Sequence, residues 1–322
     1  MQEIAKIASR QTRLVFTGMG SSHDACFPAV NELAARGILA LHVDAAELLY
    51  FRSRLLTSET LLIIVSQSGE SAEVVHLADD LRARPSGPVI VSVTNGLTNR
   101  LAERADLRLD TRAGVEIAPS TITFEASLVQ LAVIAKVLAG ADAPGACVEV
   151  HEASHLAAAG VEAILADRDG VSERVASVLR ARDMIALVGR GPARATAEMG
   201  ALTLKECGVV AEGFEAAAFR HGPFELAGRG LGAVVVATEP ETRALDLGLA
   251  VDLVQAGAGV VVLSADGTAP DGAVAVGLAS IDGSLSPAVS IVPIQLAAHR
   301  LAVDAGRIPG GYTVASKVTT RE

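Results

Sequence analysis

Residues 61–71 read Leu-Leu-Ile-Ile-Val-Ser-Gln-Ser-Gly-Glu-Ser, and this stretch decides the fold. Its first five residues form a continuous apolar run, which is typical of a strand buried on both faces of a parallel sheet. The polar residues that follow predict a turn leading into a helix that starts near Ser71. Open α/β sheets bind ligands at the carboxyl ends of such strands. The turn Ser66–Ser71 is therefore the first candidate for a binding site.

The residue types in this turn suit a phosphate group. Hydroxyls, backbone N–H groups and the positive end of the next helix dipole converge there, so a dianion can be held without a lysine. The alternative is a plain helix start, with Ser71 as the capping side chain and Glu70 or Glu73 near the first turn. The spacing alone leaves both interpretations open.

The same alternation of strand and helix continues along the chain, which implies βαβ crossovers and parallel sheets. The expected strands lie at 14–17, 39–43, 60–65, 88–93, 107–110, 184–188, 209–211, 233–237, 259–263 and 273–276. The expected helices lie at 22–36, 45–50, 71–83, 123–138, 148–165, 192–206, 241–256 and 287–305.

The two halves of the chain repeat one order of elements, and Val15–Gly20 parallels Leu187–Gly191. A duplicated unit explains this order, so we predict an α/β protein with two tandem, doubly wound, flavodoxin-like parallel-sheet domains. The small, turn-rich residues 139–145 mark the boundary. The predicted division is a first domain at 1–145, a connector helix at 146–168, a second domain at 169–305 and a C-terminal tail at 306–322.

The composition and charge of the chain indicate which kinds of binding partner to expect. Of the 322 residues half are hydrophobic, and the formal net charge of −10 disfavours nucleic acid and anionic membranes. The first thirteen residues lack the apolar block of a signal peptide, and no apolar run approaches the length of a membrane helix. Cys26, Cys147 and Cys207 form neither a disulfide framework nor a CxxC site. We predict a cytoplasmic protein with no nucleic-acid or membrane partner.

Two motifs point to other functions. Gly18–His23 is similar to a dinucleotide fingerprint, with Asp44 where a ribose-binding acid is expected, but His23 replaces the third glycine. His151 and His155, with Glu152 between them, match the HExxH zinc pattern, which needs a third ligand and a cleft. We interpret the second motif as a solvated helix face and predict no metal and no cofactor.

A carboxylate and a histidine in the second half could share proton transfers. Glu206 ends an expected helix, and His221 lies in a turn followed by glycine and proline. The alternative is structural: Glu206 would be a surface residue and His221 a capping residue.

Together these segments resemble the sugar isomerase (SIS) domain family, which includes the isomerase half of glutamine–fructose-6-phosphate aminotransferase and stand-alone phosphosugar isomerases and deaminases. The resemblance runs in order through 20–22, 66–71, 114–121, 200–206, 221–223, 292–296 and 315–319.

The resemblance implies roles for individual residues. The sugar 6-phosphate would be held by five of them, Ser22, Ser66, Gln67, Ser68 and Ser71. Further substrate contacts would come from Gly20, Ser21 and Ser120.

The resemblance also implies catalytic groups. Glu206 would move a proton between C1 and C2, and His221 would open the sugar ring. In relatives this histidine reaches into the neighbouring subunit, which implies a homodimer with shared active sites. The tail would contribute a lysine that forms a Schiff base with the open-chain ketose, and Lys317 is the candidate for it.

The chain departs from the family at three lysines. Thr203, Ile122 and Ser316 stand where relatives carry them, and Lys317 lies one position after the tail lysine. The given sequence contains no glutaminase domain and starts close to its first expected strand, where relatives have a leading helix, so we expect a trimmed or atypical N-terminus.

These departures favour isomerisation, deamination or deglycation over amino transfer. We predict a phosphosugar isomerase or deaminase that acts on a hexosamine 6-phosphate or a related amino-sugar phosphate. The alternatives are a sugar-phosphate-binding regulator without turnover and, further removed, a zinc hydrolase on His151 and His155.

Overall fold

The computed structural model describes residues 1–8, 10–117, 119–281 and 283–321, which form two compact units. The first unit is Met1–Glu152 together with the C-terminal residues from Tyr312 onward, and the second is Ala153–Gly311. No described helix is long and apolar enough to cross a membrane.

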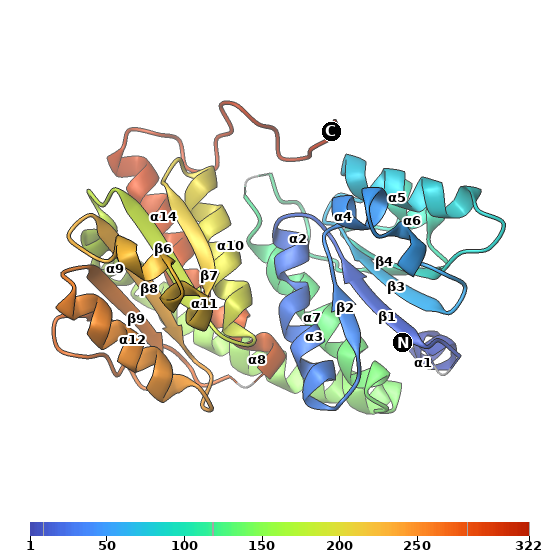
Figure 1. Ribbon diagram of the computed structural model, residues 1–322, viewed down its shortest axis with the longest axis horizontal. Helices are drawn as coiled ribbons and strands as arrows, with labels where there is room; N and C mark the ends of the chain where they lie inside the picture. Colours follow the sequence, from blue (N-terminus) through green and yellow to red (C-terminus); the bar gives the residue numbers. More distant parts are fainter. Residues whose placement is uncertain (9, 118, 282, 322) are drawn as a thin grey trace. The chain divides into compact units, whose positions relative to one another are not determined.

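The first unit contains a five-stranded parallel sheet in the order β2-β1-β3-β4-β5 (Figure 1). Its strands are β1 (Arg13–Thr17), β2 (Ala40–His42), β3 (Thr60–Val65), β4 (Val89–Thr94) and β5 (Leu107–Asp110). Its helices are α1 (Gln2–Ala8), α2 (Ser21–Asp24), α3 (Cys26–Ala35), α4 (Ala45–Tyr50), η1 (Ser53–Leu55), α5 (Ala72–Ala83), α6 (Arg100–Arg104), α7 (Ile122–Leu138) and α8 (Ala143–Ala166), the last of which continues into the second unit.

Strand β3 is the centre of this sheet, and all six of its residues are buried. It pairs with β1 on one side and β4 on the other, so its backbone groups are satisfied along both edges. Leu62 and Ile64 pack with residues of α4, α5 and α6 on one face, and α3 and α7 lie on the opposite face (Figure 1). Only an apolar run can occupy such a position, which is why residues 61–65 read as they do.

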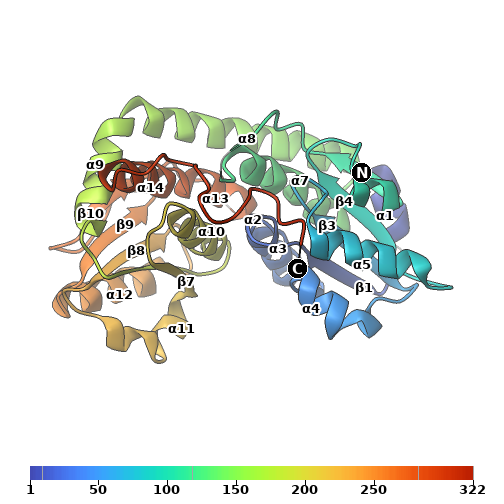
Figure 2. The ribbon, with the colours of Figure 1, turned by 90° about the horizontal axis from the view of Figure 1, so that it is seen from above.

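The second unit repeats this architecture. Its sheet has the order β10-β9-β8-β6-β7, built from β6 (Met184–Gly189), β7 (Ala211–Glu215), β8 (Leu231–Ala237), β9 (Gly259–Ser264) and β10 (Val274–Gly277). Its helices are α9 (Arg168–Leu179), α10 (Ala193–Glu206), α11 (Ala216–Arg220), η2 (Pro223–Leu226), α12 (Arg243–Gln255), η3 (Gly283–Leu285), α13 (Ser286–Ser290) and α14 (Val292–Asp304). Figure 2 shows α9, α10 and α14 on one face of this sheet and α11 and α12 on the other.

The duplication predicted from the sequence is confirmed by the strand order and by the first turn of each unit. Gly20 and Gly191, which follow β1 and β6, both have φ +53°. Two residues earlier, a Cβ on Gly18 would lie 2.9 Å from the Ser22 carbonyl carbon, and one on Gly189 would lie 2.4 Å from the Ala193 carbonyl oxygen. Each turn brings the chain so close to the strand end that only glycine fits.

Several expected boundaries were wrong. The helix expected at 22–36 is two helices that meet at Ala25, and the one expected at 287–305 divides at Ile291. Strand β7 begins at Ala211, where the sequence predicted the strand to end. A short leading helix, α1, occupies residues that the sequence treated as preceding the first element.

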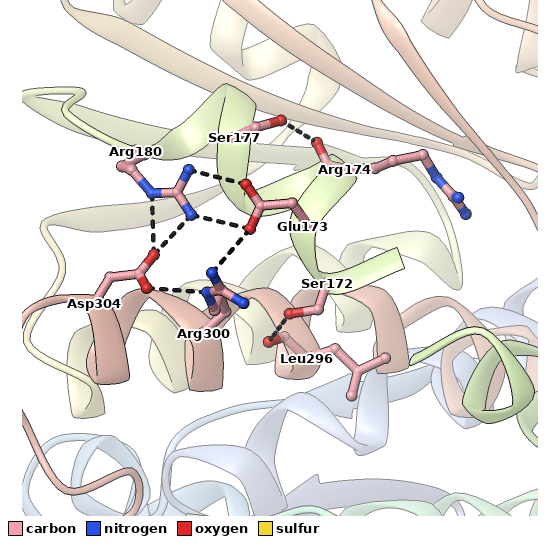
Figure 3. Close-up of polar contacts among 8 residues, drawn as sticks. All are labelled: Ser172, Glu173, Arg174, Ser177, Arg180, Leu296, Arg300 and Asp304. Atoms are coloured by element: carbon pink, nitrogen blue, oxygen red, sulfur yellow. Dashed lines mark hydrogen bonds and ion pairs between the residues drawn. The ribbon is translucent and has the colours of Figure 1, made fainter. Parts of the chain in front are cut away.

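Four charged side chains join α9 to α14 in the second unit (Figure 3). Arg180 binds Glu173 at 3.1 Å and Asp304 at 2.7 Å, and Arg300 binds the same two carboxylates at 3.4 and 2.9 Å. The hydrogen bond from Arg180 lowers the pKa of Glu173 below its ordinary value. A closed network of this kind stabilises more than isolated surface pairs, which contribute little.

We expect Glu173→Gln to lower the thermal midpoint at pH 7 and to have a smaller effect at pH 3. Because folding lowers the pKa of Glu173, the stability that it contributes is complete above the ordinary carboxyl pKa of about 4.3 and is lost as the pH falls through the folded value. Thermal unfolding from pH 3 to 7 measures the difference. Glu212→Gln, which breaks a single 3.5 Å pair with Lys205, is the matched control. An equal effect of Glu173→Gln at both pH values would contradict the expectation.

Candidate functional site

The turn Ser66–Ser71 follows β3 directly and is braced on several sides. Ser66 N donates to Val93 O (3.0 Å), and Leu101 N donates to Gly69 O (3.0 Å). The Ser66 and Ser68 hydroxyl oxygens accept from the N–H groups of Gly69 and Glu70, each at 3.1 Å. Each serine therefore accepts within the turn and keeps its hydroxyl proton for donation to an anion.

The carboxylate in the turn is directed at another helix. Glu70 Oε1 accepts from Arg100 N at the start of α6 (2.8 Å). Ser71 occupies the N-cap position of α5, but within the described residues its side chain makes no capping hydrogen bond. The interpretation of Ser71 as a side-chain cap is therefore wrong, and its hydroxyl remains suited to ligand binding.

A second turn, Gly20–Ser22, meets the start of α7. The Ser21 hydroxyl donates to the Ser120 hydroxyl at 2.9 Å, across 99 positions of sequence. The structure thus brings together two residues that the resemblance assigns to substrate binding. Ala118, within the matched stretch 114–121, lies outside the described residues.

His23 has a structural environment of its own. Its ring stacks on His42 at a centroid distance of 3.9 Å, and His42 Nε2 donates to the His23 carbonyl oxygen (3.0 Å). His23 Nε2 lies 3.9 Å from the Asp44 carboxylate. The acid that a dinucleotide site would direct at a ribose lies instead beside this imidazole.

Glu116 and Lys317 form a buried ion pair in the first unit. Lys317 Nζ lies 3.0 Å from Glu116 Oε2, and the two side chains are 18% and 4% exposed. Glu116 also accepts from the N–H groups and hydroxyls of Thr121 and Thr123 at 2.5–3.2 Å. Burial by itself raises the pKa of Glu116, but the bonds from Thr123, Thr121 and Lys317 outweigh it and lower the pKa. Sequence reasoning did not select Glu116, although it is the one charged residue in the matched stretch 114–121.

Glu125, on the first turn of α7, has the opposite environment. Burial, and next the charge of Glu116, raise the pKa of Glu125 to about 7. Two carboxyls near one helix start are therefore driven apart in pKa, a pattern that recurs in sites for proton transfer.

The equivalent turn of the second unit is acidic. After β8 the chain reads Thr-Glu-Pro-Glu-Thr at 238–242, where the first unit has its serines. Glu239 Oε1 accepts from the hydroxyls of Thr238 and Ser286, each at 3.1 Å. Nearby, Arg190 Nε binds the buried Asp246 carboxylate at 2.9 Å. The same backbone framework therefore carries carboxylates at 238–242 and hydroxyls at 66–71, and of these two equivalent turns the one in the first unit suits an anion.

The two residues expected to transfer protons both lie in the second unit. Glu206 is the last residue of α10 and is partly buried, and its charge contributes, after burial, to a raised pKa of Cys207. His221 is exposed at the end of α11, followed by Gly222 with φ +125°. The phosphate, substrate and tail residues all belong to the first unit: Gly20, Ser21, Ser22, Ser66, Gln67, Ser68, Ser71, Ser120 and Lys317.

His151 and His155 are exposed on α8. Across the described residues, no group of three or more His, Cys, Asp or Glu side chains is placed to hold a metal ion. The zinc interpretation therefore has no third ligand in this part of the chain.

Comparison with known proteins agrees with the fold and with its duplication. A family model described as SIS domain matches residues 6–136 and 178–303, one segment in each repeat. The chain is 32% identical over 319 residues to the glutamine–fructose-6-phosphate aminotransferase of Methanothermobacter thermautotrophicus, a match that covers 96% of this chain and 52% of that protein. The chain is 30% identical to the enzyme of the same name from Pyrococcus horikoshii, in a match that covers 95% of this chain and 51% of that protein. The chain thus spans about half the length of the curated relatives that it matches.

Solved structures show the same fold. The C-terminal domain of glucosamine-fructose-6-phosphate aminotransferase from Francisella tularensis superposes with a TM-score of 0.85 at 21% identity, covering 96% of this chain and 88% of that one. Glucosamine-6-phosphate deaminase from Thermotoga maritima superposes with a TM-score of 0.76 at 20% identity, and the match covers 98% of this chain and 96% of that one.

We expect Gly69→Ala to destabilise the protein more than Gly37→Ala. Both glycines have positive φ, +66° and +74°, so both variants carry a backbone cost of about 1–2 kcal/mol. A Cβ on Gly69 would also lie 2.0 Å from Asn99 Oδ1, which caps α6 by accepting from Ala102 N, whereas Gly37 has open space. Loss of that cap adds about 1 kcal/mol. Urea unfolding measures the free energy of unfolding of both variants. An equal loss of this free energy in the two would contradict the tight packing of Gly69 against Asn99.

We expect Glu125→Gln to remove a pH dependence of stability. Because folding raises the pKa of Glu125 to about 7, the folded protein retains a proton that the unfolded chain has lost, and stability falls as the pH rises from the ordinary value towards 7. Above pH 7 the variant should be more stable than the parent by on the order of 1–3 kcal/mol, and near pH 4 the two should be equal. Unfolding free energies from pH 4 to 8 test this, with the exposed Glu152→Gln as control. If the unfolding free energy of Glu125→Gln depended on pH as steeply as that of the parent, Glu125 would not be the source of the pH dependence.

Proposed function

Since the chain belongs to the SIS domain family, we propose that it is an enzyme that isomerises or deaminates a phosphosugar, with a hexosamine 6-phosphate or a related amino-sugar phosphate as substrate. The observation that carries this proposal is the Ser66–Ser71 turn, which is braced at the end of a buried central strand and opens onto the start of α5. The equivalent turn in the second unit carries carboxylates, which repel a phosphate.

The phosphate anchors the substrate in this proposal. The hydroxyls of Ser22, Ser66, Ser68 and Ser71 donate to phosphate oxygens, and the Gln67 amide adds a further donor. Backbone N–H groups at the start of the twelve-residue helix α5 complement the negative charge. Because neighbouring α6 binds the Glu70 carboxylate, that charge is directed away from the anion.

The reaction itself requires a proton to move between neighbouring carbons. We propose that His221 assists ring opening and that Glu206 carries the proton between C1 and C2 through an enediol or enamine, the roles that the family resemblance gives them. Named relatives include an aminotransferase and a deaminase of hexose 6-phosphates, which supports this class of substrate. A homodimer with shared active sites and a cytoplasmic location belong to the same proposal.

We expect Ser68→Ala to raise the KM for glucosamine 6-phosphate about 10- to 100-fold, because it removes a hydrogen bond to a charged group. Glu206→Gln should leave KM near the parent value and lower kcat by about 10²–10⁴. The assay is the exchange of the C2 proton with deuterated solvent, followed by NMR together with ammonia release. Ser177→Ala, an exposed serine on α9, is the control.

Two outcomes would overturn this proposal in different ways. Binding of the sugar phosphate without exchange in the unaltered protein would leave the regulator alternative, a binding protein without turnover. If Ser68→Ala bound glucosamine 6-phosphate with the affinity of the parent, the Ser66–Ser71 turn would not be the phosphate-binding site.

A further inference from the structure

The last residues of the chain are anchored to the first unit at two points. Thr319 O accepts from Ala72 N at 2.9 Å, and Lys317 Nζ binds Glu116 Oε2 at 3.0 Å. Ala72 is the first residue of α5 and directly follows the phosphate turn (Figure 2 shows the C-terminus beside this helix). Glu116 precedes α7, whose start meets the Gly20–Ser22 turn. The two anchors therefore attach the tail to the start of α5, which directly follows the phosphate turn, and to the segment before α7, which contains the candidate substrate residue Ser120.

The carboxylate of Glu116 explains why a lysine is needed at position 317. Four donors from Thr121 and Thr123 hold the carboxylate in place, and its side chain is only 4% exposed. Hydrogen bonds at a helix start favour the charged form, and a buried charge requires a counter-charge. The ammonium of Lys317, 18% exposed, provides it.

An ammonium bound in this way is a poor candidate for covalent chemistry. Imine formation needs the amine nitrogen within reach of a carbonyl carbon, and Nζ of Lys317 is instead held against the Glu116 carboxylate by a side chain that is only 18% exposed. The chain has four lysines, Lys6, Lys136, Lys205 and Lys317, and each has an acidic partner within 4 Å.

We infer that Lys317 is a positioning residue: it latches residues 312–321 onto the unit that carries the Ser66–Ser71 turn, and it does not form an imine with the substrate. The pair Lys317–Glu116 is the latch, and Thr319 extends it to the first N–H group of α5. Tail docking and sugar-phosphate binding are thereby coupled, since both order the start of the same helix. The latch follows from contacts in the first unit, and only its coupling to sugar-phosphate binding and turnover rests on the proposed function.

The first test measures the tail without any substrate. Hydrogen–deuterium exchange of the full chain should show the Ala72 amide and residues 312–321 exchanging at least about 10-fold faster in Lys317→Met than in the parent, because opening the latch exposes them. Lys317→Arg keeps the charge and should restore most of the protection. Lys205→Met, which removes a surface pair, is the matched control. Unchanged protection in Lys317→Met would overturn the latch.

The second test separates positioning from covalent chemistry. With glucosamine 6-phosphate, Lys317→Met should raise KM about 10-fold, with kcat within about 3-fold of the parent, and Lys317→Arg should recover the parent KM. Borohydride reduction in the presence of fructose 6-phosphate, followed by peptide mapping, should give no adduct on Lys317. An adduct there, or an equal loss of kcat in the Met and Arg variants, would overturn the inference.

The two proposals fail separately. If neither sugar phosphate binds to any variant while the exchange pattern holds, the proposed function is wrong and the latch stands. If both sugar phosphates bind and turn over in Lys317→Met with parent KM, the coupling is wrong and the proposed function stands.

Discussion

Hydrogen bonding along both edges of a buried strand is the constraint on which the first unit depends. Strand β3 is paired in parallel with β1 and β4, and its six side chains are inaccessible to solvent. Parallel pairing brings the carboxyl ends of these strands to one edge of the sheet, where each connection must turn back into a helix. The turn after β1, the turn after β3 and the segment before α7 all follow from this requirement. Polar residues placed in those connections are held by a rigid frame.

The two units share a backbone architecture but differ in the side chains that could bind a ligand. Both units have the same strand order, the same glycine geometry after the first strand and the same helical layers. They differ in the side chains after the third strand, which are hydroxyls at 66–71 and carboxylates at 238–242. In the second unit Arg190 and Asp246 neutralise each other in a buried pair. Function in this fold is therefore decided by a few residues at the strand ends and not by the sheets themselves.

Much of the fold could be predicted from the sequence because its strands are long apolar runs, and β3 was placed to the residue. Less was predictable where the signal is weak. Strand β7 contains Glu212 and Gly213 and has no apolar run. The break between α2 and α3 at Ala25 did have a local signal that the prediction overlooked, because Pro28 in the first turn of α3 has no N–H to donate to the Asp24 carbonyl. The hydroxyls of the candidate site were predictable because they are adjacent in sequence. The partner of Lys317 was not, because Glu116 lies 201 positions away and no local pattern joins the two.

The attachment of the tail also has a consequence for how the chain is made. The first unit is not a continuous piece of sequence, because its last segment begins at Tyr312, after the whole of the second unit. Ribosomes add about 5–20 residues each second, so roughly 10–40 s separate the synthesis of Glu116 from that of Lys317. During that interval the Glu116 carboxylate of the nascent first unit lacks its lysine counter-ion. Of the two units, the one whose synthesis begins first is therefore the one completed second.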